Sequence, residues 1–512
     1  MKKKNLVAVI DIGSLATGMK VYSVSDSKVP DVVESLRAYL PLGSSTYGTG
    51  AISETDIAEV CRILSGFSLK CKEYKVDQTI CVATSAFREA KNRVFALERI
   101  RMQTGFQVEI LDNTIERFYR NLIVKETLPE FAEMAAAGTA ILDIGSGSIQ
   151  STVYSDSAFV FSQNMSLGPL RIEEVYSGLE RNAPDPQAVL EEHISSVLED
   201  YHAIAPKGVK YKNLVVFGEE TVFFKSLAEM DPYTSVEMDF QTFGALYAFL
   251  GKTPASELVL DHHIPSPAAG LLRPSVLLTK KTLEYSGAEK LFLPSVSLCD
   301  GIIYHYAWKN LGLKLRFPPN QDVLDAARHM GKRYRLDKKH AERVRAFALE
   351  IFGQTRHLHG LSDRERLLLE VSAILYEVGK HIHVTNYHVR SFHIIDTTEI
   401  LGLTRTEQEI IANVARFCGE SSILSNRFFH YMSEQKRNVV AKLAAILRLA
   451  DALEASRKQK ITNLKVISEG ESLILSCEHQ SDISYECWEA DNRKDLFVEV
   501  YGVSPVLKPK KV

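Results

Sequence analysis

A duplicated hairpin constrains this chain more than any other feature of its sequence. Residues 8–24 read AVIDIGSLATGMKVYSV, and residues 140–156 read AILDIGSGSIQSTVYSD. Each copy consists of an apolar strand, an Asp-Ile-Gly-Ser turn and a second strand that contains Val-Tyr-Ser. Asp11 of the first copy and Asp143 of the second are separated by about one domain length. The repeat therefore predicts two related α/β halves, each of which opens with a β-hairpin.

Both turns have the composition of a phosphate site. Glycine lets backbone N–H groups approach an anion closely, and the adjacent serine adds a hydroxyl group. Asp11 and Asp143 stand at the strand ends and offer oxygen ligands for Mg²⁺, which binds such groups usually through water. A single motif of this kind is most often an ordinary turn, but two matched copies favour phosphate binding. The turn residues expected to contact phosphate are Gly13, Ser14, Gly145, Ser146, Gly147 and Ser148.

Composition narrows the class of protein. The net charge of −3 lacks the basic excess of a general nucleic-acid binder, so any phosphate site must be local. The seven cysteines form no CxxC pair, which argues against a disulfide framework or a zinc knuckle and favours a reducing compartment. No apolar run reaches the ~18 residues that a membrane helix needs. We therefore expect a cytoplasmic protein that binds neither nucleic acid nor membranes.

Prolines and periodicity divide the chain into four expected domains. Pro318 and Pro319 mark a boundary because helices usually stop before proline, and the signal beyond them is helical. Alternation returns after Ile461, where LKVISEGESLILSC predicts a hairpin. The expected domains are two α/β domains at residues 1–125 and 126–312, an all-α domain at residues 318–460 and a small α+β module at residues 461–512.

The first half carries a second polar motif. Residues 85–105 predict a single helix, with Thr84 or Ser85 as its cap. Arg88 and Asn92 would lie on one face of this helix, and the guanidinium of Arg88 suits phosphate binding. An exposed helix with an ordinary i,i+4 pair explains the same residues equally well.

Two stripes in the helical segment put polar residues on apolar faces. They are His340, Val344, Phe347 and Ile351 on one helix and Val440, Ala444, Leu447 and Asp451 on another. Asp451 is therefore expected to point inward. It needs a hydrogen-bond partner there, because an unpaired buried carboxylate is costly.

The ordered motifs resemble those of the Ppx/GppA family, the exopolyphosphatases and guanosine pentaphosphate phosphohydrolases of the actin-like, sugar-kinase-like superfamily. The resemblance covers essentially the whole chain. It implies duplicated actin-like (ribonuclease H-like) α/β domains, then an all-α HD-like domain and a small α+β module. The motifs that carry it are DIGS at 11–14, ATSAFREAKN at 83–92, DIGSGS at 143–148 and SLGPLR at 166–171, with a helix near 447–456 like that of longer members.

The resemblance also implies a reaction, the Mg²⁺-dependent hydrolysis of terminal phosphoanhydride bonds. The implied partners are inorganic polyphosphate or guanosine penta- and tetraphosphate, and long members of the family are generally homodimers. Glu116 occupies the place of the base that activates the attacking water, although a lone helical Glu is most often a solvated residue. Asp11 and Asp143 would anchor Mg²⁺, while Arg88 and the two turns would bind phosphate.

Several residues depart from the family pattern at the expected site. Gln150 stands in place of a Glu and keeps hydrogen bonding without charge, so we retain it as a candidate catalytic residue. Glu219 and Glu220 would repel a polyanion unless they face away or hold a metal. The changes suggest an altered substrate, slowed chemistry or lost catalysis. The departures are Leu15, Ala16 and Gly18 after the first turn, Gln150 in the second motif, Glu219 and Glu220 after Gly218, and Cys299 near the end of the second half.

The helical domain resembles the HD phosphohydrolase fold, whose metal site uses a His, an adjacent His-Asp pair and a distant Asp. His340 and Asp451 match the outer ligands, but Tyr376 and Glu377 replace the central pair, and Cys418 replaces a further His. The missing imidazole favours a structural domain with buried polar pairs over a metal site. The residual ligands for a hard divalent ion are His340, Glu377, His388 and Asp451.

Three functions remain open at this point. The first is the phosphoanhydride hydrolase, which the matched motifs and Glu116 favour. The second is a catalytically weak or inactive protein that binds polyphosphate or an alarmone in a regulatory role, which the departures favour. The third is an actin-like ATPase or sugar kinase, which Gly218, Glu219 and Glu220 support poorly because an adenosine turn needs glycine.

Overall fold

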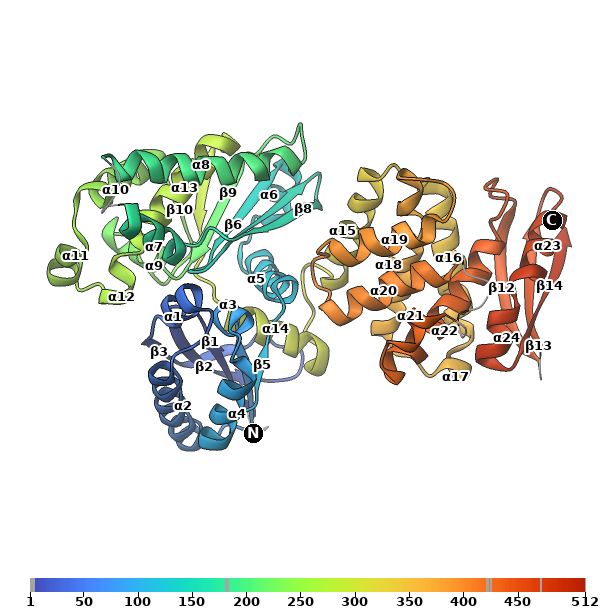
Figure 1. Cartoon of the computed structure of the whole chain (residues 1–512), viewed down its shortest axis with the longest axis horizontal. Coiled ribbons are helices and arrows are strands. Elements are labelled where there is room, and N and C mark those ends of the chain that lie inside the picture. Colours follow the sequence, from blue (N-terminus) through green and yellow to red (C-terminus); the bar gives the residue numbers. More distant parts are fainter. Residues whose placement is uncertain (1–4, 180–183, 420–422, 424–425, 470–471, 512) are drawn as a thin grey trace. The chain divides into compact units, whose positions relative to one another are not determined.

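The protein is described here by a computed structural model that covers residues 5–179, 184–419, 423, 426–469 and 472–511. It divides into two compact units, Met1–Pro319 and Asn320–Val512, each of which is described by itself (Figure 1). The first unit contains two β-sheets with helices, and the second is mostly helical with one small sheet. Within these residues, no helix is both long and apolar enough to cross a lipid bilayer.

The first sheet combines an antiparallel hairpin with parallel strands. Its strands are β1 (Asn5–Ile12), β2 (Ala16–Val24), β3 (Asp31–Tyr39), β4 (Gln78–Ala83) and β5 (Val108–Ile110), in the order β3-β2-β1-β4-β5. The β1–β2 register pairs Asp11 with Gly18, as the predicted hairpin requires. β4 and β5 run parallel to β1, so their carboxyl ends reach the same sheet edge as the first turn.

Helices cover both faces of this first sheet. They are α1 (Leu42–Thr49), α2 (Glu54–Tyr74), α3 (Ser85–Glu89), α4 (Arg93–Thr104), α5 (Asn113–Thr127) and, from much later in the chain, α14 (Leu298–Leu311). Ala8 and Ile10 of β1 join a core with residues of α2 and α4, whereas Val7 and Val9 join a core with α14. β1 is therefore buried on both faces, which explains its continuous apolar run.

The second sheet repeats the same beginning. Its strands are β6 (Thr139–Ile144), β7 (Ile149–Ser155), β8 (Ala158–Met165), β9 (Asn213–Gly218), β10 (Val236–Met238) and β11 (Lys290–Leu293), in the order β10-β11-β9-β6-β7-β8. β6 and β7 form a hairpin that pairs Asp143 with Gln150, and β9 lies parallel to β6. Both sheets thus carry an antiparallel β-meander followed by a parallel strand, and the predicted duplication is confirmed in the topology.

The remaining helices of the first unit surround the second sheet in Figure 1. They are α6 (Phe131–Ala137), α7 (Pro169–Leu179), α8 (Pro186–Ile204), α9 (Thr221–Leu227), α10 (Phe240–Lys252), α11 (Ala255–His262), α12 (Ser266–Ala269) and α13 (Leu272–Ser286). Leu142 and Ile144 of β6 and Leu214 of β9 share one core with residues of α8 and α13.

The single helix predicted for residues 85–105 is wrong. Ala90 has an extended backbone, and it separates α3 from α4. Asn92 donates from its amide to the carbonyl of Ile52 at 2.8 Å and accepts from the N–H of Ile52 at 3.0 Å. This tertiary contact replaces helical bonding, so Arg88 and Asn92 do not share a helical face. Thr84 precedes α3 but makes no capping hydrogen bond with its side chain.

The second unit is helical up to a three-stranded sheet. Its helices are α15 (Pro319–Arg333), α16 (Lys338–Gln354), α17 (Arg356–His359), α18 (Asp363–Leu375), the 3₁₀ helix η1 (Val378–His381), α19 (Tyr387–Thr397), α20 (Arg405–Phe417), α21 (Arg427–His430) and α22 (Glu434–Ala452). The elements that follow are β12 (Ile461–Glu469), β13 (Ser472–His479), α23 (Ser484–Arg493), α24 (Asp495–Tyr501) and β14 (Ser504–Lys511).

The apolar helical faces that carry His340 and Asp451 are buried as predicted, on α16 and α22. β12 and β13 also form the predicted antiparallel hairpin, whose turn lies outside the described residues. Leu464 and Leu475 of this hairpin belong to the same core cluster as Phe347 and Leu447 of the helices. Helices and strands therefore share one core, and the division of the chain into four domains stays a prediction.

Helix α14 approaches α5 so closely that glycine is needed at the contact, because a Cβ on Gly301 would overlap the backbone carbonyl of Tyr119. We predict that Gly301→Ala lowers the free energy of unfolding by about 1–3 kcal/mol, as other overpacked contacts do. Gly66→Ala on α2 is the matched control, since a Cβ there meets nothing within 4 Å and alanine favours a helix. Equal stability of both variants in urea denaturation would contradict the close approach.

Candidate functional site

The expected base lies near both expected aspartates at one edge of the sheets. Asp11 stands at the end of β1, and Asp143 stands at the corresponding end of β6. α5 begins directly after β5, which puts Glu116 in its first turn, where the residue is only 7% exposed. Glu116 is close enough to influence the charge of both aspartates. Three motifs that are distant in the sequence thus contribute carboxylates to one buried region.

Two arginines bracket Glu116. Arg88 of α3 donates from Nη1 to Oε2 of Glu116 at 3.2 Å and to the carbonyl of Leu111 at 2.6 Å. Arg120, one turn further along α5, places Nη2 3.4 Å from Oε1 of Glu116 and Nε 3.2 Å from Oδ2 of Asp143. Arg120 therefore connects the expected base to the second turn. Sequence reasoning missed it, although an i,i+4 spacing from Glu116 is the usual signal of a helical ion pair.

Burial dominates the electrostatics of the two aspartates. It raises the pKa of Asp11 to about 7, although the charge of Arg120 works in the opposite direction. Burial likewise raises the pKa of Asp143 to about 7 against the attraction of Arg120. Among the described residues, neither Oδ1 of Asp11 nor Oε1 of Gln150 has a hydrogen-bond partner. The region thus holds more acidic groups than its cations neutralise.

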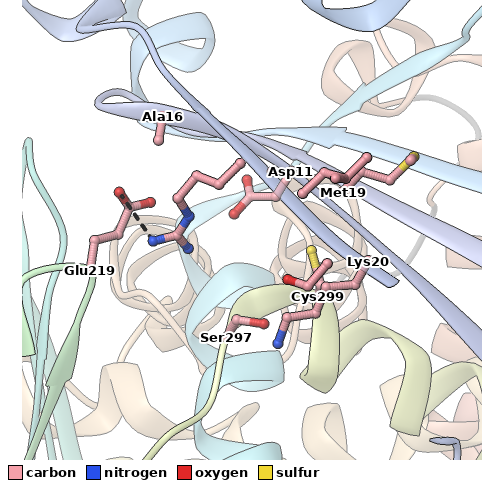
Figure 2. Close-up of a pocket in the computed structure, with 11 residues that line it drawn as sticks. Asp11, Ala16, Met19, Lys20, Glu219, Ser297 and Cys299 are labelled. Carbon is pink, nitrogen blue, oxygen red and sulfur yellow. Dashed lines mark ion pairs between the residues drawn. The ribbon is translucent and has the colours of Figure 1, made fainter. Parts of the chain in front are cut away.

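A small cavity adjoins Asp11. It has a volume of about 30 Å³, which is room for about one or two water molecules. Asp11 and Glu219 both line this cavity, and Figure 2 shows the guanidinium that pairs with Glu219 between their carboxylates. Arg37 forms an ion pair with Glu219 at 4.0 Å. Glu219 therefore faces the site, which is the orientation expected to repel a polyanion.

Two other departures from the family pattern carry little charge in this region. Glu220 is 2% exposed, and neither of its carboxyl oxygens has a hydrogen-bond partner among the described residues. Burial and then the neighbouring Glu219 raise the pKa of Glu220 to about 8, so it is largely protonated at neutral pH. Burial also raises the pKa of the Cys299 thiol, which lies 3.7 Å from the carbonyl of Val9.

Each hairpin turn contains a backbone hydrogen bond that uses one of its own N–H groups. The N–H of Gly13 donates to the carbonyl of Ala16 at 2.9 Å, and that of Gly145 donates to the carbonyl of Ser148 at 3.0 Å. The carbonyl of Ser146 accepts from the first turn of α7 at 2.9 Å. The N–H groups of Gly13 and Gly145 therefore close the turns and do not point freely toward an anion.

Tyr47 of α1 occupies the second turn. Its hydroxyl lies where a Cβ would stand on Gly147, and it hydrogen-bonds to Oγ of Ser14 at 2.9 Å and of Ser85 at 3.0 Å. Arg171 donates from Nε to the carbonyl of Gly147 at 2.7 Å, with its guanidinium 4.0 Å above the Tyr47 ring. Side chains of the protein thus close the first turn onto the second. No local pattern marks Tyr47, whereas Arg171 ends the SLGPLR motif.

As it lies, Asp143 does not fit a bound Mg²⁺. Arg120 approaches both oxygens of Asp143, Oδ2 from Nε at 3.2 Å and Oδ1 from Nη1 at 3.4 Å. A permanent cation against both oxygens opposes a metal ion at the same carboxylate. The described part of the chain contains one group of His, Asp and Glu side chains whose possible metal-ligand atoms all lie within 4.8 Å of one another. This group lies in the second unit instead.

That group consists of His340, Glu377 and Asp451. The hydroxyl of Tyr376 lies between two of them, 2.6 Å from Nε2 of His340 and 2.6 Å from Oδ1 of Asp451, to which it donates. Tyr376 is the residue that stands where the expected HD pattern would have a histidine. Its hydroxyl connects the two outer residues of that pattern directly.

Cations balance the carboxylates of this group. Arg493 donates to Oδ2 of Asp451 at 2.5 Å, and Glu377 accepts from Arg457. Burial alone would raise the pKa of Asp451, but the hydrogen bond from His340 and the charge of Arg493 hold it well below its usual range. Asp451 thus has the partners that its burial requires. His388 is not part of the group, and burial lowers its pKa to about 4.

Sequence comparison identifies the family. A model of the Ppx/GppA phosphatase family matches residues 20–250, and one of Ppx/GppA phosphatase, domain III, matches residues 325–488. The chain belongs to the Ppx/GppA phosphatase family. The crystal structure of an exopolyphosphatase from Cytophaga hutchinsonii superposes with a TM-score of 0.53 at 16% identity, over 60% of this chain and 99% of that one. This likeness shows that the Ppx/GppA member shares the fold, and the resemblance inferred from the motifs is confirmed.

Two relatives of this Ppx/GppA member carry the name guanosine-5'-triphosphate,3'-diphosphate pyrophosphatase. The one from Aeromonas hydrophila is 30% identical over 34% of this chain, and the match spans only 34% of that relative. The one from Pseudoalteromonas atlantica is 20% identical over 90% of this chain and 88% of the relative. The matches define the general chemistry of the family and leave the substrate of this member open.

Gly147→Ala is predicted to expel Tyr47 from the second turn, because the new methyl group would overlap its hydroxyl. The lost hydrogen bonds should lower the free energy of unfolding by about 1–3 kcal/mol. A double-mutant cycle tests the cause, since Gly147→Ala should cost much less in a Tyr47→Ala background. Additive losses in thermal denaturation would show that Tyr47 does not occupy the turn.

Tyr376→Phe removes the hydroxyl that His340 and Asp451 share. It should lower the free energy of unfolding by about 1–3 kcal/mol, because it leaves buried polar atoms unpaired. Tyr431→Phe is the matched control, since Tyr431 is 81% exposed. EDTA should leave the melting temperature of the wild type unchanged. A melting temperature that falls on addition of EDTA would instead indicate a structural metal ion.

Proposed function

We propose that this Ppx/GppA member hydrolyses the terminal phosphoanhydride bond of inorganic polyphosphate, of pppGpp, or of both. The observation that carries the proposal is the position of Glu116, buried beside Asp143 and bracketed by Arg88 and Arg120. A carboxylate can orient the attacking water and accept its proton, and guanidinium groups can stabilise the charge on a phosphoryl group. The names of the relatives agree with this class of reaction.

In this mechanism the terminal phosphate replaces Glu116 as the partner of the two arginines. Arg88 and Arg120 contact Glu116 in the described structure, and both guanidinium groups form stronger paired contacts with phosphate oxygens. When they turn to the substrate, the carboxylate of Glu116 is free to orient a water molecule and accept its proton. The arginines meanwhile stabilise the charge that develops on the phosphoryl oxygens. Gln150 can donate a hydrogen bond near Asp143 but cannot act as a base.

Two conditions must be met before a substrate binds. Tyr47 must leave Gly147, because its hydroxyl fills the second turn. The magnesium ion expected from the sequence would also have to displace Arg120 from Asp143, and the steps above involve side chains of the protein alone. The magnesium requirement, the cytoplasmic location and the homodimer stay predictions.

A second function is favoured by a specific observation, the orientation of Glu219 into the cavity beside Asp11. A carboxylate in that position weakens the binding of a polyanion and slows its chemistry. On this alternative the protein binds polyphosphate or an alarmone in a regulatory role with little or no turnover. It shares the phosphate contacts of the first proposal and differs in the rate of the chemical step.

Glu116→Gln is predicted to lower the release of orthophosphate from polyphosphate or pppGpp by about 10²–10⁴-fold, because the amide cannot accept a proton from water. Glu109→Gln is the matched control, since Glu109 is exposed on β5 and lies outside the site. Phosphate release by the purified full-length chain is the measurement, with and without Mg²⁺. Calorimetric binding of polyphosphate without release, unchanged by Glu116→Gln, would reject the hydrolase and support the regulatory alternative.

A further inference from the structure

The guanidinium of Arg120 contacts the carboxylates of both Glu116 and Asp143. Its three guanidinium nitrogens lie 3.4 Å from Oε1 of Glu116, 3.2 Å from Oδ2 of Asp143 and 3.4 Å from Oδ1 of Asp143. The exposed fractions of the three side chains are 16%, 9% and 5% for Arg120, Glu116 and Asp143. One guanidinium therefore contacts carboxylates from two separate motifs, away from bulk water.

A divalent ion and this guanidinium cannot share the two carboxylates. Mg²⁺ binds oxygens at about 2.0–2.1 Å and requires a nearly octahedral set of ligands. Arginine keeps its proton under all ordinary conditions, so Arg120 cannot give up its charge to make room for the ion. An ion on Asp143 would lie a few ångströms from a permanent cation, in a region where water and salt screen the repulsion poorly.

The backbone holds Arg120 in this place. Arg120 follows Glu116 by four residues on α5, so the two side chains are neighbours on one helical face. Asp143 is fixed by the β6–β7 register opposite Gln150. If Arg120 turned away with no other partner for the acids, Glu116 and Asp143 would be left as buried charges next to Asp11. The arrangement thus favours a guanidinium beside Glu116 and Asp143 over carboxylates with no cation beside them.

We propose that Arg120 is the resident cation of this site and excludes a divalent metal ion from Glu116 and Asp143. The inference rests on the site of the proposed function and does not require turnover. A terminal phosphate that enters the site then meets Arg88 and Arg120 directly, and the guanidinium forks bind it without a metal ion between them. Arg120 takes the role that the metal ion holds in the expected mechanism.

Binding of Mn²⁺, a paramagnetic probe for Mg²⁺ sites, tests the proposal on the full-length chain. The free ion is measured by electron paramagnetic resonance for the wild type, Arg120→Gln, Asp143→Asn and the double variant. We expect Arg120→Gln to bind one more Mn²⁺ than the wild type, or to bind it about tenfold more tightly or better, because the competing charge is gone. Asp143→Asn should abolish this gain in the double variant and should not change Mn²⁺ binding of the wild type.

Arg37→Gln is the matched control, since Arg37 pairs with Glu219 and lines the small cavity beside Asp11. If Arg37→Gln gains as much Mn²⁺ binding as Arg120→Gln, the effect is one of general charge and the proposal fails. It also fails if a folded Arg120→Gln gains nothing, or if the wild type already binds Mn²⁺ through Asp143. If Arg120→Gln does not fold, the comparison of wild type with Asp143→Asn decides alone. None of these outcomes depends on phosphate release, so an inactive chain leaves the test intact.

Discussion

Carboxyl groups that are removed from water need a cation or a proton, and this constraint shapes both units of the chain. In the first unit, Arg120 reaches from α5 to the second hairpin turn and ties Glu116 to Asp143. In the second unit, Arg493 serves Asp451 in the same way. The family motifs led us to expect a magnesium ion at the first place and buried polar pairs at the second. The protein supplies its own cations at both.

The fold was largely readable from the sequence where the signal is local. The two Asp-Ile-Gly-Ser hairpins follow from the sequence repeat and the buried faces of α16 and α22 follow from apolar periodicity, and the structure contains them. The errors have tertiary causes. The helix at residues 85–105 is interrupted because Asn92 bonds the backbone of Ile52, forty residues earlier. Helix α14 lies in the range expected for the second half but packs on the first sheet, which no local pattern indicates.

The site was predictable only in its framework. Glu116, Arg88, Asp11 and Asp143 were identified from the motifs, and the structure gathers them in one region. Their charge balance could not be read in the same way, because it depends on which side chains fill the space between the motifs. Tyr47 comes from a helix with no recognisable pattern, and its contact with Gly147 exists only once the two halves have folded together.

The two acidic groups differ in a way that bears on where function resides. Around Asp451 each carboxylate has a cation or a hydrogen-bond donor, and the pKa of Asp451 itself stays below the usual range, as in a structural ion pair. Around Asp11 the balance is incomplete, because burial raises the pKa of Asp11 and Asp143 to about 7 and that of Glu220 to about 8. Acidic groups that titrate near neutral pH in a buried site are costly for stability and are typical of sites that exchange protons or bind ligands. Arg120 limits that cost without removing it, so the first unit is where we place the proposed chemistry of this Ppx/GppA member.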